Sequence, residues 1–376
     1  MQARETLEKI WWAGVRRVSG YESVTQALAE TEPGAFTHIA AVGKAASPML
    51  RAALDANGSD TPALLVTKQG HAEPELQGEN LAIIESAHPV PDENTLRAGE
   101  ALIDFVSGAG TNARLLLLVS GGASALAEAL PSGMTLDDLQ SMNRRMLAEG
   151  LDIHAINARR KEVSRIKGGK LLARFPGTSA KVLLISDVEG DDVAVIGSGI
   201  GEIPATRRHE NFDAEIVASN AIARDACERE ASDLGLEVIV NTENLYGDVF
   251  KLAAELAKTV LPGAPGLYIF GGEPVTVLPD NPGEGGRNQA LAAAFAREIA
   301  GTPGLAALAA GTDGTDGPTG SAGGFVTGES WNETPGGDDA LAAADSGNWL
   351  RRADGLFVTG PTGTNVMDIM LVLKSG

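Results

Sequence analysis

The segment "GEGGRNQALA" (283–292) places an arginine directly behind three glycines and in front of an alanine-rich helical pattern. A cation is poorly placed at a helix start, because the helix N-terminus already carries partial positive charge. A bound anion would satisfy both the arginine and the free backbone N–H groups of the first turn. The segment therefore predicts that Gly285, Gly286 and Arg287 contact an anionic ligand.

Two further loops have the same strand, loop and helix pattern. "VGKAAS" (42–47) puts Lys44 where an apolar strand becomes a helix, and a phosphate there would satisfy the lysine and the backbone N–H groups. "VSGGASAL" (119–126) offers small residues whose backbone N–H groups can approach phosphate oxygens, namely Ser120, Gly121, Gly122 and Ser124. The alternatives are a solvated surface lysine and an ordinary glycine turn.

The segment "INARRKEVSRIKGGKLL" (156–172) is the most basic stretch of an otherwise acidic chain. One interpretation is a solvated helix face that pairs with acidic neighbours. The other is a source of positive potential for an anion site. On the second interpretation we expect Lys167 to contact a nucleotide and Arg160 to contact the substrate.

Aspartates follow two apolar runs at the points where strands are expected to end. "ISDVEGDD" (185–192) contains Asp187, and "GTDGTDG" (311–317) contains Asp313 and Asp316. Carboxylates in such places bind Mg²⁺ when phosphates share the metal, so all three are candidate metal ligands. Asp187 is also a candidate base for an acceptor hydroxyl. The alternative is a turn or helix-cap aspartate, which we expect of Asp191 or Asp192.

Short apolar runs separated by helical patterns must position these loops. Their lengths predict buried parallel strands and an α/β fold with layered, mostly parallel sheets. Ligands of such folds bind at the carboxyl ends of the strands, where glycines and polar residues gather here. The runs are "THIAAVG" (37–43), "ALLVT" (63–67), "LAIIES" (81–86), "RLLLLVS" (114–120), "KVLLISD" (181–187), "EIVASN" (215–220), "LEVIV" (236–240), "GLYIFGG" (266–272), "LAALAAG" (305–311) and "GLFVTG" (355–360).

Composition excludes several classes of protein. A chain of 376 residues suits two domains, and a formal net charge of -20 argues against nucleic acid as a partner. One cysteine, Cys227, excludes an internal disulfide and fits a reducing compartment. No apolar run is long enough for a membrane span, so we expect a cytoplasmic protein. The P-loop, dinucleotide, serine hydrolase and zinc protease motifs are all missing from the sequence.

Taken in order, the motifs resemble those of glycerate 2-kinases of the glycerate kinase/MOFRL type. The resemblance spans nearly the whole chain and rests on "AVGKAA", "VTKQGHAEP", "HPVPDENTLRAGEAL", "LLLVSGGASAL", "INARRKEVSRIKGGKLLARF", "LLISDVEGDD", "SNAIARDA", "GGEPVTV", "GEGGRNQALA", "GTDGTDGPT" and "VTGPTGTNVMD". It implies a kinase that uses ATP and Mg²⁺ to phosphorylate D-glycerate at its 2-hydroxyl. It also implies that Lys44 and Arg287 handle phosphate.

The resemblance further implies a Rossmann-like N-terminal domain and a smaller C-terminal MOFRL-type domain, with the active site in the cleft between them. We place the boundary near 230, which gives domains 1–230 and 231–376. We also expect Asn288 and Glu273 to contact the substrate, and the protein to be a monomer or homodimer. The alternatives are an NAD(P)H-dependent hydroxypyruvate reductase, a kinase for another short hydroxy acid and a non-catalytic sensor of sugar acids.

Three stretches depart from the family pattern. Ala123 stands where the glycine loop usually has a third glycine, and the loop at 199–209 has an unusual sequence. At 320–324, "GSAGG" replaces a segment that usually contains an aspartate. The second departure bears on the identity of the hydroxy acid, and the third on one polar or metal contact.

Overall fold

The structure is a computed structural model that describes residues 3–149, 153–207 and 211–376, and the chain forms two compact units in it. The first, here called the parallel-sheet unit, is Ser19–Ser219. The second, the mixed-sheet unit, combines the segment that ends at Val18 with Asn220–Gly376. We placed the boundary near 230, whereas the two units meet between Ser219 and Asn220. The N-terminal segment, which we assigned to the first domain, belongs to the mixed-sheet unit.

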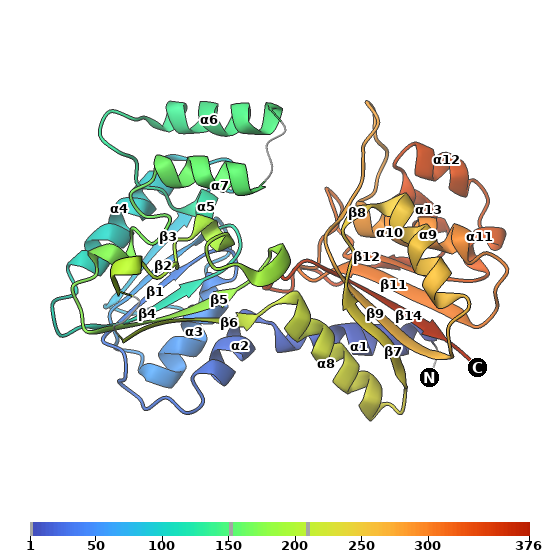
Figure 1. The fold of residues 1–376 in the computed structure, drawn as a ribbon, viewed down its shortest axis with the longest axis horizontal. Helices are drawn as coiled ribbons and strands as arrows, with labels where there is room; N and C mark the ends of the chain where they lie inside the picture. Colours follow the sequence, from blue (N-terminus) through green and yellow to red (C-terminus); the bar gives the residue numbers. More distant parts are fainter. Residues whose placement is uncertain (1–2, 150–152, 208–210) are drawn as a thin grey trace. The chain divides into compact units, whose positions relative to one another are not determined.

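In the described part of the chain, the parallel-sheet unit contains a six-stranded sheet of order β3-β2-β1-β4-β5-β6 (Figure 1). All of its strand pairs are parallel. This is the strand order of the Rossmann fold, so the prediction of a Rossmann-like domain is confirmed. The strands are β1 (His38–Val42), β2 (Ala63–Lys68), β3 (Leu81–Ser86), β4 (Arg114–Val119), β5 (Ser179–Ile185) and β6 (Asn211–Ala218).

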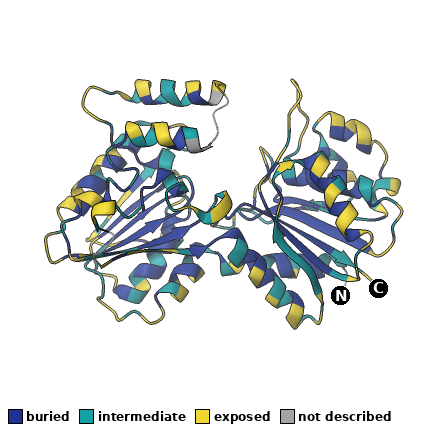
Figure 2. Ribbon diagram, in the orientation of Figure 1, coloured by how far each residue is buried: buried dark blue, intermediate teal, exposed yellow. Residues whose placement is uncertain are grey.

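Helices cover both faces of this sheet, which explains why its strands read as continuous apolar runs. Alternate strand residues such as Val42 and Leu117 pack with Leu102 of α4 in one core cluster. Figure 2 shows the central strands as buried and the outer surfaces of the helices as exposed. The helices are α2 (Gly20–Ala27) and α3 (Ala46–Asn57) on one face, and α4 (Glu93–Ser107), α5 (Ala123–Leu126), α6 (Leu136–Ala148) and α7 (Ile153–Glu162) on the other (Figure 1).

The mixed-sheet unit has, among its described residues, a six-stranded sheet of order β13-β12-β11-β14-β9-β7. Only β7 and β9 pair in parallel, and the other neighbours pair antiparallel. The expectation of mostly parallel strands is therefore wrong for this unit. The strands are β7 (Val238–Glu243), β9 (Gly266–Gly272), β11 (Leu305–Gly311), β12 (Gly323–Thr327), β13 (Leu356–Phe357) and β14 (Asp368–Lys374), and a separate parallel pair joins β8 (Gly247–Asp248) to β10 (Pro274–Val275).

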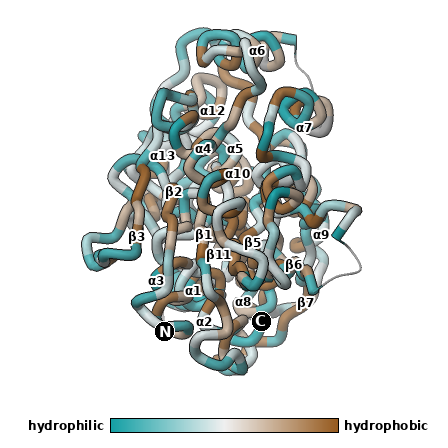
Figure 3. The backbone as a smooth tube through the Cα atoms, turned by 90° about the vertical axis from the view of Figure 1, so that its left-hand side faces the viewer, coloured by the Kyte–Doolittle hydropathy of each residue, from teal (hydrophilic) through white to brown (hydrophobic). Residues whose placement is uncertain are grey.

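The physical reason is that an apolar run reports burial on both faces of a strand and not its direction. β11 is buried at every position and was predicted, but its neighbour β14 was not among the predicted runs. Figure 3 shows hydrophobic residues concentrated along strands of both kinds. Two helices cover one face of the mixed sheet, namely α1 (Ala3–Arg17) and α8 (Asn220–Asp233). The other face is covered by α9 (Val249–Val260), α10 (Arg287–Glu298), α11 (Ser330–Glu333), α12 (Gly337–Ala342) and α13 (Ser346–Arg352).

Helix α1 joins the mixed-sheet unit through buried aromatic and polar contacts. Trp11 is 0% exposed and packs edge-on against Phe357, with ring centroids 5.0 Å apart. Thr364 Oγ1 donates a hydrogen bond to the carbonyl oxygen of Val18 at 2.6 Å. These contacts explain why an N-terminal amphipathic helix belongs with residues more than 300 positions away. Within the described residues, no helix combines the length and apolarity that crossing a membrane requires.

Candidate active site

The first candidate site lies where β1 and β4 end, at the point where the strand order of the parallel sheet reverses. The chain leaves these two neighbouring strands toward helices on opposite faces of the sheet (Figure 1). Open α/β sheets bind their ligands at such a point. Lys44 follows β1, and Ser120 to Gly122 follow β4. The backbone N–H of Lys44 donates to the carbonyl oxygen of Gly121 at 2.9 Å, and that of Ala45 donates to Ser120 Oγ at 3.0 Å. The two predicted loops therefore form one hydrogen-bonded structure.

The glycines of this loop are needed because functional side chains pack directly on the backbone. A Cβ atom at Gly121 would lie 2.1 Å from Oδ2 of Asp187. Gly122 has φ 83° and faces the Lys44 side chain, with only 3.0 Å between its ideal Cβ position and Lys44 Cγ. The structure thus brings together Lys44, Gly121, Gly122 and Asp187, as their positions at strand ends led us to expect.

Three more basic side chains surround Lys44, and we did not identify them from the sequence. They are Lys68 at the end of β2, His71, and His88 after β3. Burial, together with the charges of Lys44, Lys68 and His71, lowers the pKa of His88 to about 4. Their segments, "VTKQGHAEP" and "HPVPDEN", were part of the family resemblance but carried no predicted role. His88 is therefore neutral at pH 7, and the positive potential that suits an anionic ligand comes from Lys44 and Lys68.

Beside this cluster lies a pocket of about 220 Å³ that includes Gly122, Ser124, Asn157, Arg160, Asp187 and Ser198 in its lining. Arg160 was the predicted substrate contact, and burial lowers the pKa of its guanidinium. Ser124 belongs to a series of hydrogen-bonded side chains in this pocket. Its Oγ lies 2.8 Å from Ser198 Oγ, which donates to Asn157 Oδ1 at 2.8 Å. The pocket therefore presents both charged and polar groups to a small polar molecule.

Three residues of the basic stretch, Lys161, Arg165 and Lys167, pair with acidic side chains in the described part of the chain. Lys161 pairs with Glu202 at 3.1 Å, and Lys167 pairs with Glu128 at 2.5 Å. The side chain of Lys167 is 2% exposed and also donates to the carbonyl oxygen of Ser124 at 2.8 Å. Burial lowers the pKa of Lys167, and Glu128 opposes this effect. Lys167 thus holds the carbonyl group of Ser124 and is not among the residues that line the pocket.

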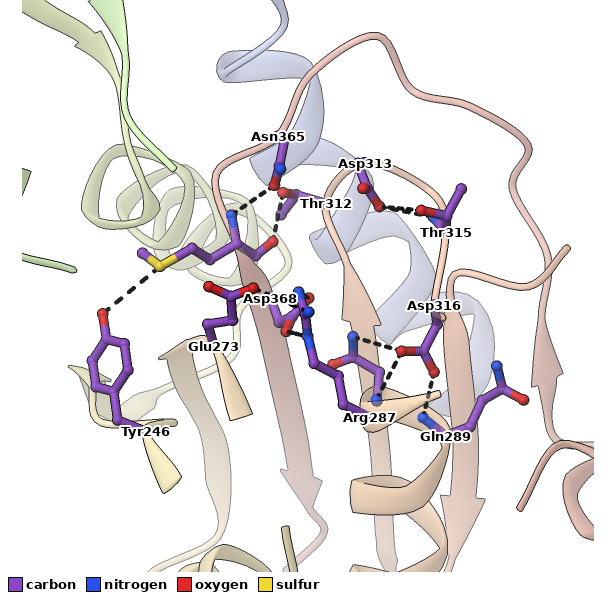
Figure 4. Close-up of polar contacts among 12 residues, drawn as sticks. Tyr246, Glu273, Arg287, Gln289, Thr312, Asp313, Thr315, Asp316, Asn365 and Asp368 are labelled. Carbon is purple, nitrogen blue, oxygen red and sulfur yellow. Dashed lines mark hydrogen bonds and ion pairs between the residues drawn. The ribbon is translucent and has the colours of Figure 1, made fainter. Parts of the chain in front are cut away.

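A second cluster, in the mixed-sheet unit, explains the start of α10. The carboxylate of Asp316 accepts hydrogen bonds from the backbone N–H groups of Asn288 at 3.0 Å and Gln289 at 2.8 Å (Figure 4). Burial raises the pKa of Asp316, these two N–H donors oppose the rise, and the resulting pKa is about 6. The anion that the helix start required is therefore at least partly supplied by the chain itself.

Arg287 is held on both sides by carboxylates (Figure 4). It contacts Asp368 through Nε at 2.6 Å and Glu273 through Nη1 at 3.0 Å. Burial lowers the pKa of Arg287, but Asp368 and Glu273 outweigh this effect and raise it. A pocket of about 370 Å³ next to Arg287 is lined in part by Gly285, Gly286 and Glu273. We did not predict Asp368, although "VTGPTGTNVMD" ends on it.

The remaining predicted residues of this unit serve local structure. Asn288 is 1% exposed, and its side chain donates to Asp316 at 3.4 Å. Asp313 Oδ1 accepts from the backbone N–H and the hydroxyl of Thr315, both at 2.9 Å. Nowhere in the described ranges do three or more His, Cys, Asp or Glu side chains gather closely enough to hold a metal. A Mg²⁺ ion that phosphates help to hold is compatible with this finding, because it needs one or two carboxylates from the protein.

The three departures from the family pattern lie in different settings. Ala123 is 0% exposed and opens α5. In the loop at 199–209, residues 208 and 209 lie outside the described residues. Residues 320–324 include the first two residues of β12, where a Cβ atom at Gly323 would be 1.9 Å from the carbonyl oxygen of Ala309.

Comparison with known proteins divides the chain into two family regions, whose limits differ from those of the two compact units. Residues 6–228 match the family described as "Domain of unknown function (DUF4147)", and residues 266–368 match the MOFRL family. A glycerate 2-kinase of Pyrococcus horikoshii is 33% identical over 89% of this chain and 87% of its own length. A D-glycerate 2-kinase of Thermotoga maritima is also 33% identical, over 89% of this chain and 90% of its own length. The crystal structure of a Thermotoga maritima glycerate kinase aligns with a TM-score of 0.89, 30% identity and 99% coverage of both chains.

Proposed function

The chain belongs to the glycerate kinase family built from DUF4147 and MOFRL domains, and we propose that it transfers the γ-phosphoryl group of ATP to the 2-hydroxyl of D-glycerate in a Mg²⁺-dependent reaction. The observation that carries this proposal is the packing of Lys44 and Asp187 on the same glycine loop, with Arg160 in the adjoining pocket. Lys44 and the backbone N–H groups of the loop are thereby available to phosphate. Asp187 is available to the acceptor hydroxyl, and Arg160 to the carboxylate of the substrate.

Phosphoryl transfer needs mainly positioning and charge neutralisation. On this proposal, Lys44 and the backbone N–H groups of the loop stabilise the negative charge of the phosphoryl oxygens. Arg287, anchored by Asp368, supplies the other phosphate-handling cation. Asp187 accepts the proton of the attacking hydroxyl or orients it, and Arg160 binds the carboxylate of the acid.

Asp187 is the described carboxylate that best fits a Mg²⁺ ligand, because it contacts the loop on which phosphates are expected to lie. Asp316 fits less well, since both of its oxygens accept backbone N–H groups of α10. A metal held by Asp187 and phosphate oxygens would neutralise charge on the transferring group.

The decisive experiment incubates the protein with D-glycerate, ATP and Mg²⁺, and separately with hydroxypyruvate and NADH. We expect ADP release that depends on glycerate, and a phosphorus NMR spectrum of 2-phosphoglycerate. NADH oxidation without ADP release would overturn the proposal in favour of a reductase. Faster phosphorylation of another hydroxy acid would change the substrate, and binding without turnover would indicate a sensor.

A further inference from the structure

Asn157 places a buried and unpaired hydrogen-bond donor in the 220 Å³ pocket of the parallel-sheet unit. The residue is 6% exposed and lines the pocket together with Arg160, one turn further along α7. Its Nδ2 atom has no hydrogen-bond partner among the described residues. An amide nitrogen left unpaired in a buried position is costly, so its persistence at a pocket wall indicates that a ligand completes it.

A chain of hydroxyl groups orients this amide. Ser198 donates its only hydroxyl proton to Asn157 Oδ1 at 2.8 Å, so the contact between Ser124 Oγ and Ser198 Oγ at 2.8 Å must have Ser124 as its donor. With Oδ1 occupied, the NH₂ group of Asn157 is the part of the amide that is left without a partner. The hydrogen bonds therefore run from Ser124 to Ser198 to Asn157, and they end on the NH₂ donor of Asn157.

The backbone around Ser198 is held in an unusual conformation for this contact. Gly197, Ser198 and Gly199 have φ values of 56°, 58° and 74°, and Ser198 is 1% exposed. The left-handed region is unfavourable for a residue other than glycine, and such strain clusters at functional sites. Glycine at 198 would adopt this conformation more easily, so the serine brings a hydroxyl group whose observed use is to orient Asn157.

We propose that Asn157, oriented by Ser198 and Ser124 and flanked by Arg160, forms the subsite that binds the carboxylate of the hydroxy-acid substrate. This inference rests on the proposed function and assigns the acid-recognition part of its site. A carboxylate accepts hydrogen bonds and carries negative charge, so it suits an amide NH₂ beside a guanidinium. Asn157 contacts the substrate in this proposal, whereas Ser198 and Ser124 are positioning residues.

The test measures kcat and KM for D-glycerate and for ATP in the full-length protein and three variants. Asn157→Ala removes the donor, Asn157→Asp replaces it by an acceptor, and Ser198→Gly removes the orienting hydroxyl without opposing the positive φ. We expect KM for glycerate to rise about tenfold to a hundredfold in both Asn157 variants, and several-fold in Ser198→Gly. KM for ATP should stay within twofold of wild type. Asn211→Asp, at the exposed start of β6, adds the same charge elsewhere as a control.

A second measurement uses D-glyceramide, in which a neutral amide replaces the carboxylate. Wild type should prefer glycerate strongly, and Asn157→Asp should lose most of that preference. The proposal is overturned if KM for glycerate stays within twofold in Asn157→Ala, if only the aspartate variant is affected, or if KM for ATP rises equally. Circular dichroism and thermal unfolding identify variants that do not fold; if both Asn157 variants fail, Ser198→Gly decides.

Failure of the kinase assay in wild type would refute the proposed function and leave this subsite testable. Isothermal titration of wild type and Asn157→Ala with D-glycerate alone then supplies the measurement. Weaker binding by about tenfold in the variant supports the subsite. Equal binding, or no binding to either protein, overturns it.

Discussion

Arg287 and Asp368 form a two-point ion pair in which the carboxylate is buried and the guanidinium is partly exposed. Nε lies 2.6 Å from Oδ2 and Nη2 lies 3.3 Å from Oδ1. The side chain of Asp368 is 1% exposed, whereas that of Arg287 is 38% exposed. One edge of the guanidinium is thus anchored by the protein, and Nη1 on its other side contacts Glu273 (Figure 4). The pair fixes a partly buried cation at the start of α10.

Replacing Arg287 by Met should destabilise the protein in a pH-dependent way. Burial raises the pKa of Asp368, and Arg287 opposes this rise, so the variant should have a still higher Asp368 pKa. A carboxyl group with a raised folded-state pKa contributes stability at low pH and loses it as pH rises through that pKa. We expect a loss of about 1–3 kcal/mol at pH 7 and a smaller loss at pH 5, measured by urea unfolding. Arg297→Met, on the same helix, should cost less than about 0.5 kcal/mol at either pH; equal losses for Arg287→Met at both pH values would contradict the prediction.

Replacing Gly121 by Ala should displace the Asp187 carboxylate. The new Cβ atom would lie 2.1 Å from Oδ2, so the side chain of Asp187 or the loop must shift. We expect kcat to fall at least tenfold with little change in thermal stability. Gly78→Ala is the matched control, since its Cβ position has only Leu81 Cβ nearby, at 3.9 Å. Equal kcat values in the two variants would show that the contact between Gly121 and Asp187 does not matter for turnover.

Asp187→Asn keeps the size of the side chain and removes its charge. We expect a large fall in kcat while the protein stays folded, because the side chain contacts the proposed phosphate loop. A Mg²⁺ titration separates the two proposed roles. Recovery at high Mg²⁺ favours a metal ligand, and no recovery favours a base. Near-normal turnover at saturating Mg²⁺ would exclude both.

Lys44→Met and Arg287→Met should each lower kcat more than they raise KM for glycerate. Cations aimed at the equatorial oxygens stabilise the transition state more than the ground state, and losing one costs about 3 kcal/mol, or roughly a hundredfold. If both residues act on one phosphoryl group, the double variant should be less impaired than the product of the single effects. Multiplicative losses would show that they act on separate groups, and an unchanged kcat in either single variant would remove that residue from the mechanism.

His88 should report anion binding at the cluster around Lys44. Its pKa of about 4 reflects burial and repulsion from Lys44, Lys68 and His71. A polyphosphate ligand would offset that repulsion, so its addition should raise the pKa observed by NMR of the imidazole. Because the folded-state pKa is lowered, His88 stabilises the protein above its unfolded pKa of about 6.5, and this stability is lost as pH falls toward 4. An unchanged imidazole titration in the presence of saturating ATP would place the phosphates elsewhere.

Much of the parallel-sheet unit follows from local pattern. Each apolar run that ends in a small-residue loop became a strand of the sheet, and Lys44, Gly121 and Asp187 could be identified from their places directly after such runs. The reason is that parallel strands align their carboxyl ends at one edge, so sequence position at the end of a strand already implies proximity. Asn157, which lies on α7, falls outside this rule, and only its neighbours in space reveal it.

The mixed-sheet unit depended on contacts between distant segments. No local hydrophobic pattern encodes the directions of the strands or the place of α1. The same holds for the partner of Arg287, which lies 81 residues away in the sequence. The sequence by itself determined that an anion belongs at the start of α10. Only the tertiary structure decided that Asp316 fills part of that need and that Lys167 pairs with buried Glu128, because a charge selects its partner by distance and burial after the chain has folded.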